Sequence, residues 1–127
     1  MHVSDERFEE IINLTMDELP QKYIAGLDNV AITYEDEPSP GQREKLKLRC
    51  DSLLFGLYEG VPRTSRGGIN NLVLPDKITL FKKPILHVSA DEVQLKSNVK
   101  HTLWHEIAHY YGLDHEHIHA IEKRWRK

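Results

Sequence analysis

The segment from Ser89 to Tyr111 contains neither proline nor glycine, and no other feature of the sequence constrains the fold as strongly. Apolar residues recur along it near helical spacing, and in its last three turns they leave almost no polar face. A helix that is apolar nearly all round is buried in the protein. We therefore predict a long helix with a buried C-terminal end, begun by a capping box in which Ser89 caps the helix and Glu92 reaches back to it.

Two histidines and a glutamate occupy the end of this predicted helix. His105 and His109 are four residues apart, so they share one helix face, with Cβ atoms about 5–6 Å apart. Their imidazole nitrogens can converge on one metal ion, typically Zn2+. Glu106 lies next to this face without competing for the metal, which is the position that a general base needs.

The residues after the helix supply a third histidine. Gly112 permits the left-handed conformation that ends a helix, and the chain can then turn back to present His115. Asp114 is expected to cap a final helix over residues 115–125. Chance can produce His-Glu-x-x-His in a chain with eight histidines, but Gly112 and His115 make a coincidence far rarer. We predict that one catalytic Zn2+ ion is bound by the imidazoles of His105, His109 and His115. These three ligands leave a fourth position open on the ion.

Other residues near the motif compete for the role of third ligand. All of them follow Gly112, and they are His119, Glu116, Asp114 and Glu122. His101 is four residues before His105, but a helix rises about 12 Å over eight residues, so His101 and His109 cannot both join His105 on one tetrahedral ion. We expect His101 to be a polar groove residue. His117 and His119 lie either around the metal or elsewhere on the last helix.

Composition narrows the class of protein. The 127 residues suit a single domain spanning 1–127, and a net charge of −3 gives no reason to expect a nucleic-acid partner. Cys50 is the only cysteine, which excludes a disulfide within the chain and fits a reducing compartment. The first residues are rich in charge and lack the apolar core of a signal peptide, and the apolar run Leu53–Tyr58 is too short to span a bilayer. We expect a soluble, cytoplasmic protein with no membrane partner.

The rest of the chain reads as one helix followed by short strands. The apolar stripe of Ser4–Leu19 predicts the helix. Alternating apolar residues predict a half-buried strand at Asn29–Glu35. Two further strands are predicted at Leu53–Glu59 and Lys77–Phe81. Gln42–Arg49 is either a short helix or a charged loop, Thr64–Asn71 is a turn, and Pro84 closes the segment after the last strand. This order predicts an α+β fold with a mixed sheet packed on the long metal-binding helix. The strand nearest the metal offers a free edge to an extended peptide.

Seven short segments along the whole chain match a known family. They are Phe8–Glu10, Asp17–Pro20, Leu27–Val30, Glu35–Pro38, Leu57–Pro62, Leu74–Leu80 and His105–His109. In these segments the chain resembles the zincin-like metallopeptidases, in particular a family of short single-domain bacterial proteins. The resemblance implies a minimal zincin core and a peptidase activity. The family often carries an acidic residue at the third-ligand position, here His115, and either type binds zinc. The motif also resembles the metzincins, but these need a methionine turn downstream, whereas Met1 and Met16 both lie upstream.

These features predict a zinc-dependent metallopeptidase that acts on a peptide or protein substrate. Zinc would lower the pKa of its bound water to about 7, and Glu106 would take the proton and pass it to the leaving amine. Four residues are candidates for a further hydrogen-bond donor to the oxyanion, namely Tyr111, His117, Tyr58 and Arg66. Two alternatives stay open, a zinc-binding adaptor without catalysis and a protease that acts on one protein partner only. The sequence leaves the oligomeric state open.

Overall fold

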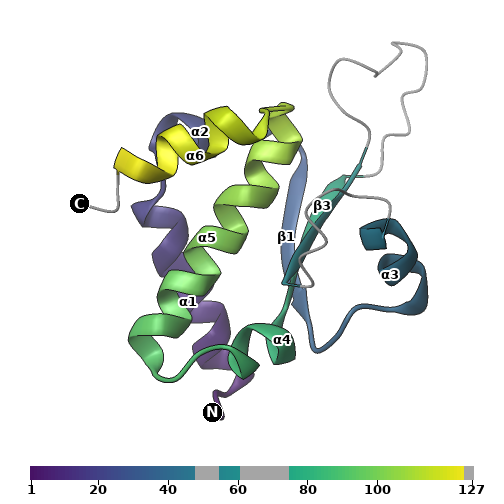
Figure 1. Ribbon diagram of the computed structural model, residues 1–127, viewed down its shortest axis with the longest axis vertical. Coiled ribbons are helices and arrows are strands. Elements are labelled where there is room, and N and C mark those ends of the chain that lie inside the picture. The colour runs from purple at the N-terminus through teal and green to yellow at the C-terminus, as the bar shows by residue number, and fades with distance from the viewer. Residues whose placement is uncertain (48–54, 61–74, 125–127) are drawn as a thin grey trace.

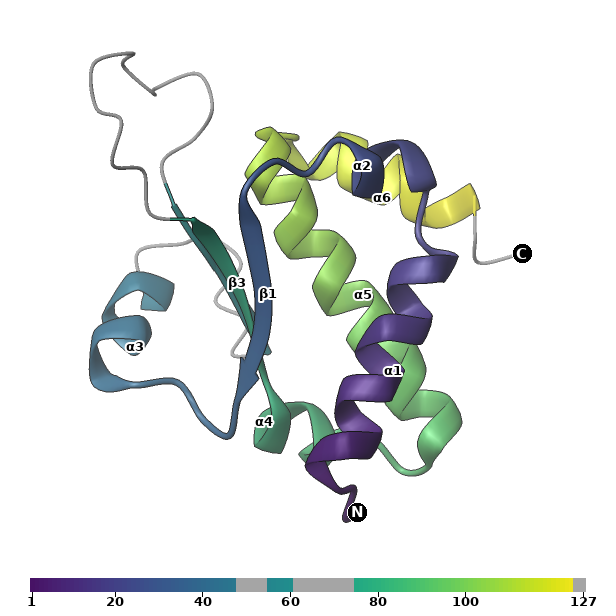
Figure 2. The ribbon, with the colours of Figure 1, turned by 180° about the vertical axis from the view of Figure 1, so that it is seen from behind.

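Helices lie on both sides of a three-stranded sheet in the computed structural model of the protein (Figures 1 and 2). The structure describes residues 1–47, 55–60 and 75–124. Its elements are α1 (Asp5–Glu18), α2 (Gln21–Ala25), β1 (Val30–Glu35), α3 (Pro40–Lys47), β2 (Gly56–Glu59), β3 (Asp76–Phe81), α4 (Lys82–His87), α5 (Glu92–Tyr111) and α6 (His115–Arg124). Within these described ranges, no helix is both long enough and apolar enough to cross a membrane.

Strand β3 lies at the centre of the sheet, between β1 and β2. It pairs in parallel with β1, where Ile32 is the partner of Ile78, and antiparallel with β2, where Tyr58 is the partner of Ile78. The last four residues of β3 are all fully buried. Since successive side chains of a strand point to opposite faces, both faces of the sheet are covered at its centre. The mixed sheet and the long helix beside it confirm the predicted fold class.

Helix α5 packs against α1 and against the sheet strands β2 and β3 (Figure 1). One core cluster joins its C-terminal half to three neighbouring elements, and it contains Leu103, Trp104, Ile107 and Ala108 of α5 with Leu19, Ile78 and Ile118. Burial of one such aliphatic side chain contributes about 1.5–3 kcal/mol. The predicted burial of the end of this helix is confirmed, and the cluster fixes the part of α5 that carries the metal motif.

The start of α5 differs from the prediction. Asp91 caps the helix in place of Ser89, because Asp91 Oδ1 accepts from the Gln94 N–H at 2.9 Å. Gln94 Oε1 in turn accepts from the N–H of the residue before the cap, at 2.8 Å. Ser89 instead donates to the Ile85 carbonyl at 2.7 Å, at the end of α4. Asp91 and Gln94 thus take the capping roles that the sequence prediction gave to Ser89 and Glu92.

Helix α4 is a second departure from the sequence prediction. Pro84 does not close the segment after β3, because it is the third residue of α4. A proline is tolerated in the first turn of a helix, where the missing N–H would have no partner within the helix. The chain therefore passes from β3 through α4 directly to the start of α5.

The segment Gln42–Arg49 fitted either a helix or a charged loop in the sequence. Its described part, up to Lys47, belongs to helix α3, and residues 48 and 49 lie outside the described residues. Ser39 and Gln42 make a reciprocal capping box. Ser39 Oγ accepts from the Gln42 N–H at 3.1 Å, and Gln42 Oε1 accepts from the Ser39 N–H at 2.8 Å. Gln42 Nε2 also donates to Glu59 Oε1 at 3.2 Å, which joins α3 to β2.

The predicted first helix and three strands are confirmed as α1, β1, β2 and β3. Ser4 caps α1, since its Oγ accepts from the Arg7 N–H at 3.1 Å. Cys50, the predicted turn Thr64–Asn71 and the first part of the predicted strand Leu53–Glu59 lie outside the described residues.

Candidate metal centre

The predicted metal motif lies on the last turns of α5, where the helix ends as the sequence predicts. Gly112 adopts the left-handed conformation, with φ 72° and ψ 25°. Its N–H donates to the His109 carbonyl at 3.0 Å, and the Leu113 N–H donates to the Ala108 carbonyl at 3.0 Å. This pair of bonds is a Schellman motif, which satisfies the last carbonyls of the helix. The motif reverses the chain next to the two histidines of α5.

Helix α6 begins directly after this turn, with His115 as its first residue. Asp114 caps α6 as predicted, because its Oδ1 accepts from the His117 N–H at 2.9 Å. The same oxygen lies 2.8 Å from His117 Nδ1. The backbone N–H of His117, and after it the His117 ring, lower the pKa of Asp114. The His117 side chain is exposed, so it lies on the solvent face of α6.

The structure brings the three predicted imidazole ligands together. The ring centroids of His105 and His109 are 4.7 Å apart, and that of His115 lies 5.8 Å from His105 and 6.5 Å from His109. Three imidazoles on one tetrahedral zinc ion, with bonds of about 2.0–2.1 Å, have ring centres about 5 Å apart. The first pair matches this spacing and the third ring lies somewhat wider. The close group of ligand atoms comprises His105, Glu106 and His109, and the exposed His115 lies outside it. Three imidazoles are a donor set that zinc favours, and the role of His115 as third ligand stays a prediction.

Glu106 lies between the histidines and the sheet, and only 3% of its surface is exposed. Its Oε1 accepts a hydrogen bond from the Tyr58 N–H of β2 at 2.7 Å. Metal-ligating atoms of His105, Glu106 and His109 all lie within 4.8 Å of one another. A buried carboxylate held next to two imidazoles is where the predicted general base should be, although the roles of base and ligands themselves stay predictions.

Strand β2 approaches α5 closely at Gly56. A Cβ at this position would lie 2.7 Å from Thr102 Cγ2 and 3.3 Å from both Glu106 Cγ and the Thr79 carbonyl oxygen. Only a glycine fits this gap without movement of the helix or the strand. Gly56 was not among the residues predicted to shape the site, although an isolated glycine within a predicted strand is a known sign of close backbone approach.

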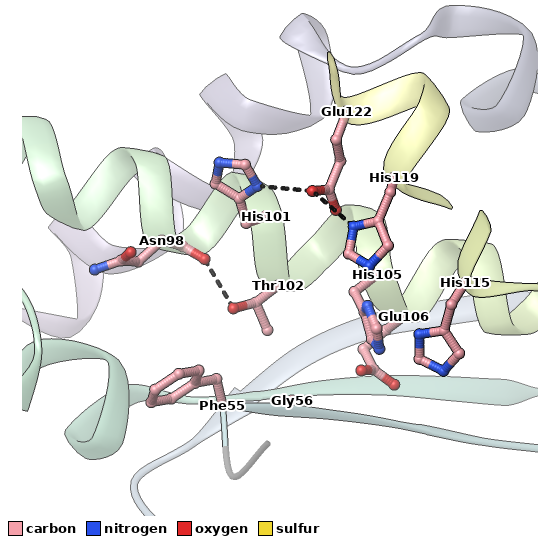
Figure 3. Close-up of a pocket in the computed structure, with 10 residues that line it drawn as sticks. All are labelled: Phe55, Gly56, Asn98, His101, Thr102, His105, Glu106, His115, His119 and Glu122. Carbon is pink, nitrogen blue, oxygen red and sulfur yellow. Dashed lines mark hydrogen bonds and ion pairs between the residues drawn. The ribbon is translucent and has the colours of Figure 1, made fainter. Parts of the chain in front are cut away.

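A pocket of about 460 Å³ opens next to the metal motif (Figure 3). His105, Glu106 and His115 line it, together with two further histidines, His101 and His119. His101 is thus the groove residue that the sequence predicts. His119 belongs to the same pocket, whereas His117 does not line it.

Two of the four candidate oxyanion donors are engaged in other contacts. The Tyr111 hydroxyl donates to a backbone carbonyl of α2 at 2.6 Å, and the Tyr58 hydroxyl donates to Asp76 Oδ2 at 2.7 Å. His117 lies on the exposed face of α6, and Arg66 is outside the described residues. Tyr58 takes part in the site through its backbone N–H, which donates to Glu106 Oε1. No side-chain pattern could indicate this contact, because nearly every residue has a backbone N–H.

Comparison with known proteins adds a family to this geometry. A family model described as zincin-like metallopeptidase matches residues 27–125, which include the whole sheet, α5 and α6. No curated protein matches the chain. Among solved structures, the fold is similar to that of a conserved hypothetical protein from Thermus thermophilus, with a TM-score of 0.51 and 24% sequence identity. The similarity covers 95% of this chain and 99% of that protein, and it concerns the fold alone.

Proposed function

The chain belongs to the zincin-like metallopeptidase family, and on this basis we propose that it is a zinc-dependent peptide hydrolase. In this proposal three imidazoles hold the zinc ion, those of His105, His109 and His115, and Glu106 is the general base. One observation carries the proposal: the three rings converge next to a buried carboxylate. A carboxylate in that place is of use for proton transfer, whereas a purely structural zinc site usually closes with four protein ligands, often cysteines.

Each group then has a defined task. When bound, zinc supplies Lewis acidity, which polarises a carbonyl group and lowers the pKa of water to about 7. Glu106 takes the proton from the attacking water on its carboxylate and delivers it to the amine of the leaving group. The Tyr58 N–H, at 2.7 Å from Glu106 Oε1, keeps the carboxylate in one orientation throughout. The packing of Glu106 against β2 excludes bulk water from that side.

The edge of β2 that faces Glu106 suits an extended peptide substrate. The Phe81 N–H donates to the Phe55 carbonyl at 2.8 Å, so alternate residues of β2 direct their backbone groups to β3 and the residues between them direct theirs away. Gly56 and Tyr58 are those intervening residues, and the Tyr58 N–H reaches Glu106. Because Glu106 holds the Tyr58 N–H, a peptide or protein strand at this edge would pair with the other outward backbone groups of β2. It would then pass directly beside the carboxylate and the imidazoles.

The decisive variant is Glu106→Gln, which keeps the shape of the side chain and its acceptor for the Tyr58 N–H. We expect cleavage of a peptide library to slow by about 10²–10⁴-fold while zinc content, measured by elemental analysis, stays that of the wild type. The matched control is Glu116→Gln, which removes an exposed glutamate in the first turn of α6. That control should retain both zinc and cleavage.

Other results would point elsewhere. Wild-type protein without near-stoichiometric zinc under non-chelating conditions contradicts the metal site, and full cleavage by Glu106→Gln contradicts the general base. Stoichiometric zinc with tight binding of a protein partner, and no cleavage of any peptide, favours a zinc-binding adaptor. Cleavage of that partner alone favours a protease of narrow specificity.

A further inference from the structure

The buried carboxylate of Asp76 has no task in the proposed hydrolysis, although one residue links it to Glu106. Asp76 is the first residue of β3, and only 3% of its surface is exposed. The Tyr58 hydroxyl donates a hydrogen bond to Asp76 Oδ2 at 2.7 Å. A carboxylate removed from water is costly unless hydrogen-bond donors compensate it, so this bond favours one position of the Tyr58 side chain against β3.

The chain that follows Tyr58 also lies close to Asp76. Gly60 comes directly after β2, and a Cβ at this position would lie 2.6 Å from Asp76 Oδ1 and 2.8 Å from Asp76 Cβ. Only a glycine allows such a close approach. The Asp76 side chain therefore joins the end of β2, an edge strand, to the central strand of the sheet.

Tyr58 is held on α5 as well as on β3. It pairs with Ile78 in the antiparallel ladder, and its ring packs against the ring of Tyr110, with centroids 5.9 Å apart and planes at 88°. Edge-to-face contacts of this kind are favourable. Because β2 is a strand of four residues that is bonded to β3 alone, these side-chain contacts add to a short ladder. They leave the backbone of Tyr58 little freedom to turn.

The backbone N–H of the same residue holds the proposed general base. It donates to Glu106 Oε1 at 2.7 Å, and Glu106 is as buried as Asp76. One residue thus binds two buried carboxylates, one through its hydroxyl and the other through its N–H. Displacement of a catalytic group by about 1 Å can slow a reaction by about 10²-fold, so a shift of Tyr58 would reach the reaction through Glu106.

We propose that Asp76 is a positioning residue for Glu106 and acts through Tyr58. Asp76 contacts neither the substrate nor the metal in this proposal. It fixes the Tyr58 hydroxyl, and Tyr58 thereby keeps its N–H on the carboxylate of Glu106. The effect on catalysis rests on the proposed hydrolysis, whereas the effect on the Tyr58 N–H does not.

The variant Tyr58→Phe tests the proposal in the full chain, because it removes only the donor to Asp76 and keeps the ring and the N–H. We expect the amide of residue 58 to exchange about 10–100-fold faster by NMR, because a hydrogen bond to a charged group is lost. We expect kcat for peptide cleavage to fall by about 10–100-fold, while KM and zinc content stay those of the wild type.

The matched control is Tyr34→Phe on β1, the opposite edge strand. The Tyr34 ring also packs edge-to-face, on Phe8, and its hydroxyl reaches a backbone carbonyl. This control should leave both the exchange at residue 58 and kcat unchanged. Asp76→Asn keeps an oxygen that accepts from the Tyr58 hydroxyl but loses the charge, so both quantities should lie between those of the wild type and Tyr58→Phe.

Three outcomes would overturn the proposal. One is unchanged exchange at residue 58 in Tyr58→Phe, and another is faster exchange there with no loss of kcat while Glu106→Gln is inactive. The third is an equal rise in exchange over the core amides of α5 and β3, because Asp76 would then stabilise the fold as a whole. If Glu106→Gln cleaves at the full rate, the proposed hydrolysis fails, and the exchange at residue 58 alone decides whether Asp76 holds the Tyr58 N–H.

Discussion

The metal motif on α5 is surrounded by core residues, whereas His115 begins α6 at the surface. Glu106 on α5 is 3% exposed and is held by a backbone donor from β2, the Tyr58 N–H. His115 is exposed, and its position depends on the turn at Gly112 and on the Asp114 cap. Tertiary packing therefore fixes the proposed base, and local turn chemistry fixes the proposed third ligand. We call the surroundings of Glu106 the packed side and those of His115 the exposed side. Changes on the packed side should alter catalysis most, and changes on the exposed side should alter metal affinity most.

The largest effect is expected from Gly56→Ala, on the packed side. The new Cβ would lie 2.7 Å from Thr102 Cγ2 and 3.3 Å from Glu106 Cγ, so β2 and α5 must separate. Overpacking of this kind costs about 1–3 kcal/mol, to be measured by urea denaturation. Because both helix histidines move together with α5, we expect the rate of peptide cleavage to fall more than the affinity for zinc.

Gly41→Ala is the matched control for that substitution. Gly41 is an exposed glycine in α3, and a Cβ there meets nothing within 4 Å. Alanine is also a better helix former than glycine, so no loss of stability is expected. If Gly56→Ala is as stable and as active as Gly41→Ala, then the close approach of β2 to α5 is not a requirement of the proposed active site.

A smaller loss of stability and the opposite functional pattern are expected from Gly112→Ala. With φ at 72°, a side chain at this position costs about 1–2 kcal/mol. The strain acts on the turn that leads to His115, so zinc affinity should fall while the packing of Glu106 is kept. Gly112→Asn is the control, because asparagine tolerates the left-handed conformation. Its zinc affinity should lie between those of the wild type and Gly112→Ala. Equal zinc affinity in all three proteins would mean that the turn does not set the third ligand.

The sequence was most informative about the exposed side, because its signals are local. The left-handed Gly112 and the Asp114 cap each act on residues at most five positions away, and both predictions are confirmed. The start of α5 was predicted less well, because a contact with another helix influences it. Ser89 and Asp91 both have side chains that suit a cap. Ser89 is instead bonded to α4, a helix that the sequence did not predict.

The sequence predicted the burial of the packed side, but the contacts that hold it were beyond the reach of sequence patterns because they join distant segments. The Tyr58 N–H meets Glu106 across 48 positions of the chain, through a backbone group that carries no residue-specific signal. Glu122 and His101 come together from two different helices. The spacing of residues along the sequence predicted His101 in the groove and Glu122 only as a candidate third ligand. Spacing alone cannot show how α6 crosses α5.

The smallest effect is expected from acid acting on the α6 cap. The His117 N–H, and then the His117 ring, lower the pKa of Asp114 below its usual value. A lowered folded-state pKa stabilises the folded protein above the unfolded value, about 3.9 for aspartate, and this contribution is lost as the pH falls through the folded pKa. Below about pH 4, amide hydrogen exchange of α6 should therefore rise before that of the C-terminal half of α5.

Asp114→Asn isolates this effect, because asparagine caps a helix without titrating. In that variant the exchange of α6 amides should no longer rise before that of the α5 amides below about pH 4. The exchange of the buried α5 amides serves as the internal reference. If α6 and the end of α5 open together in both proteins, the two sides of the metal centre form one cooperative unit, and the difference between packed and local support does not extend to stability.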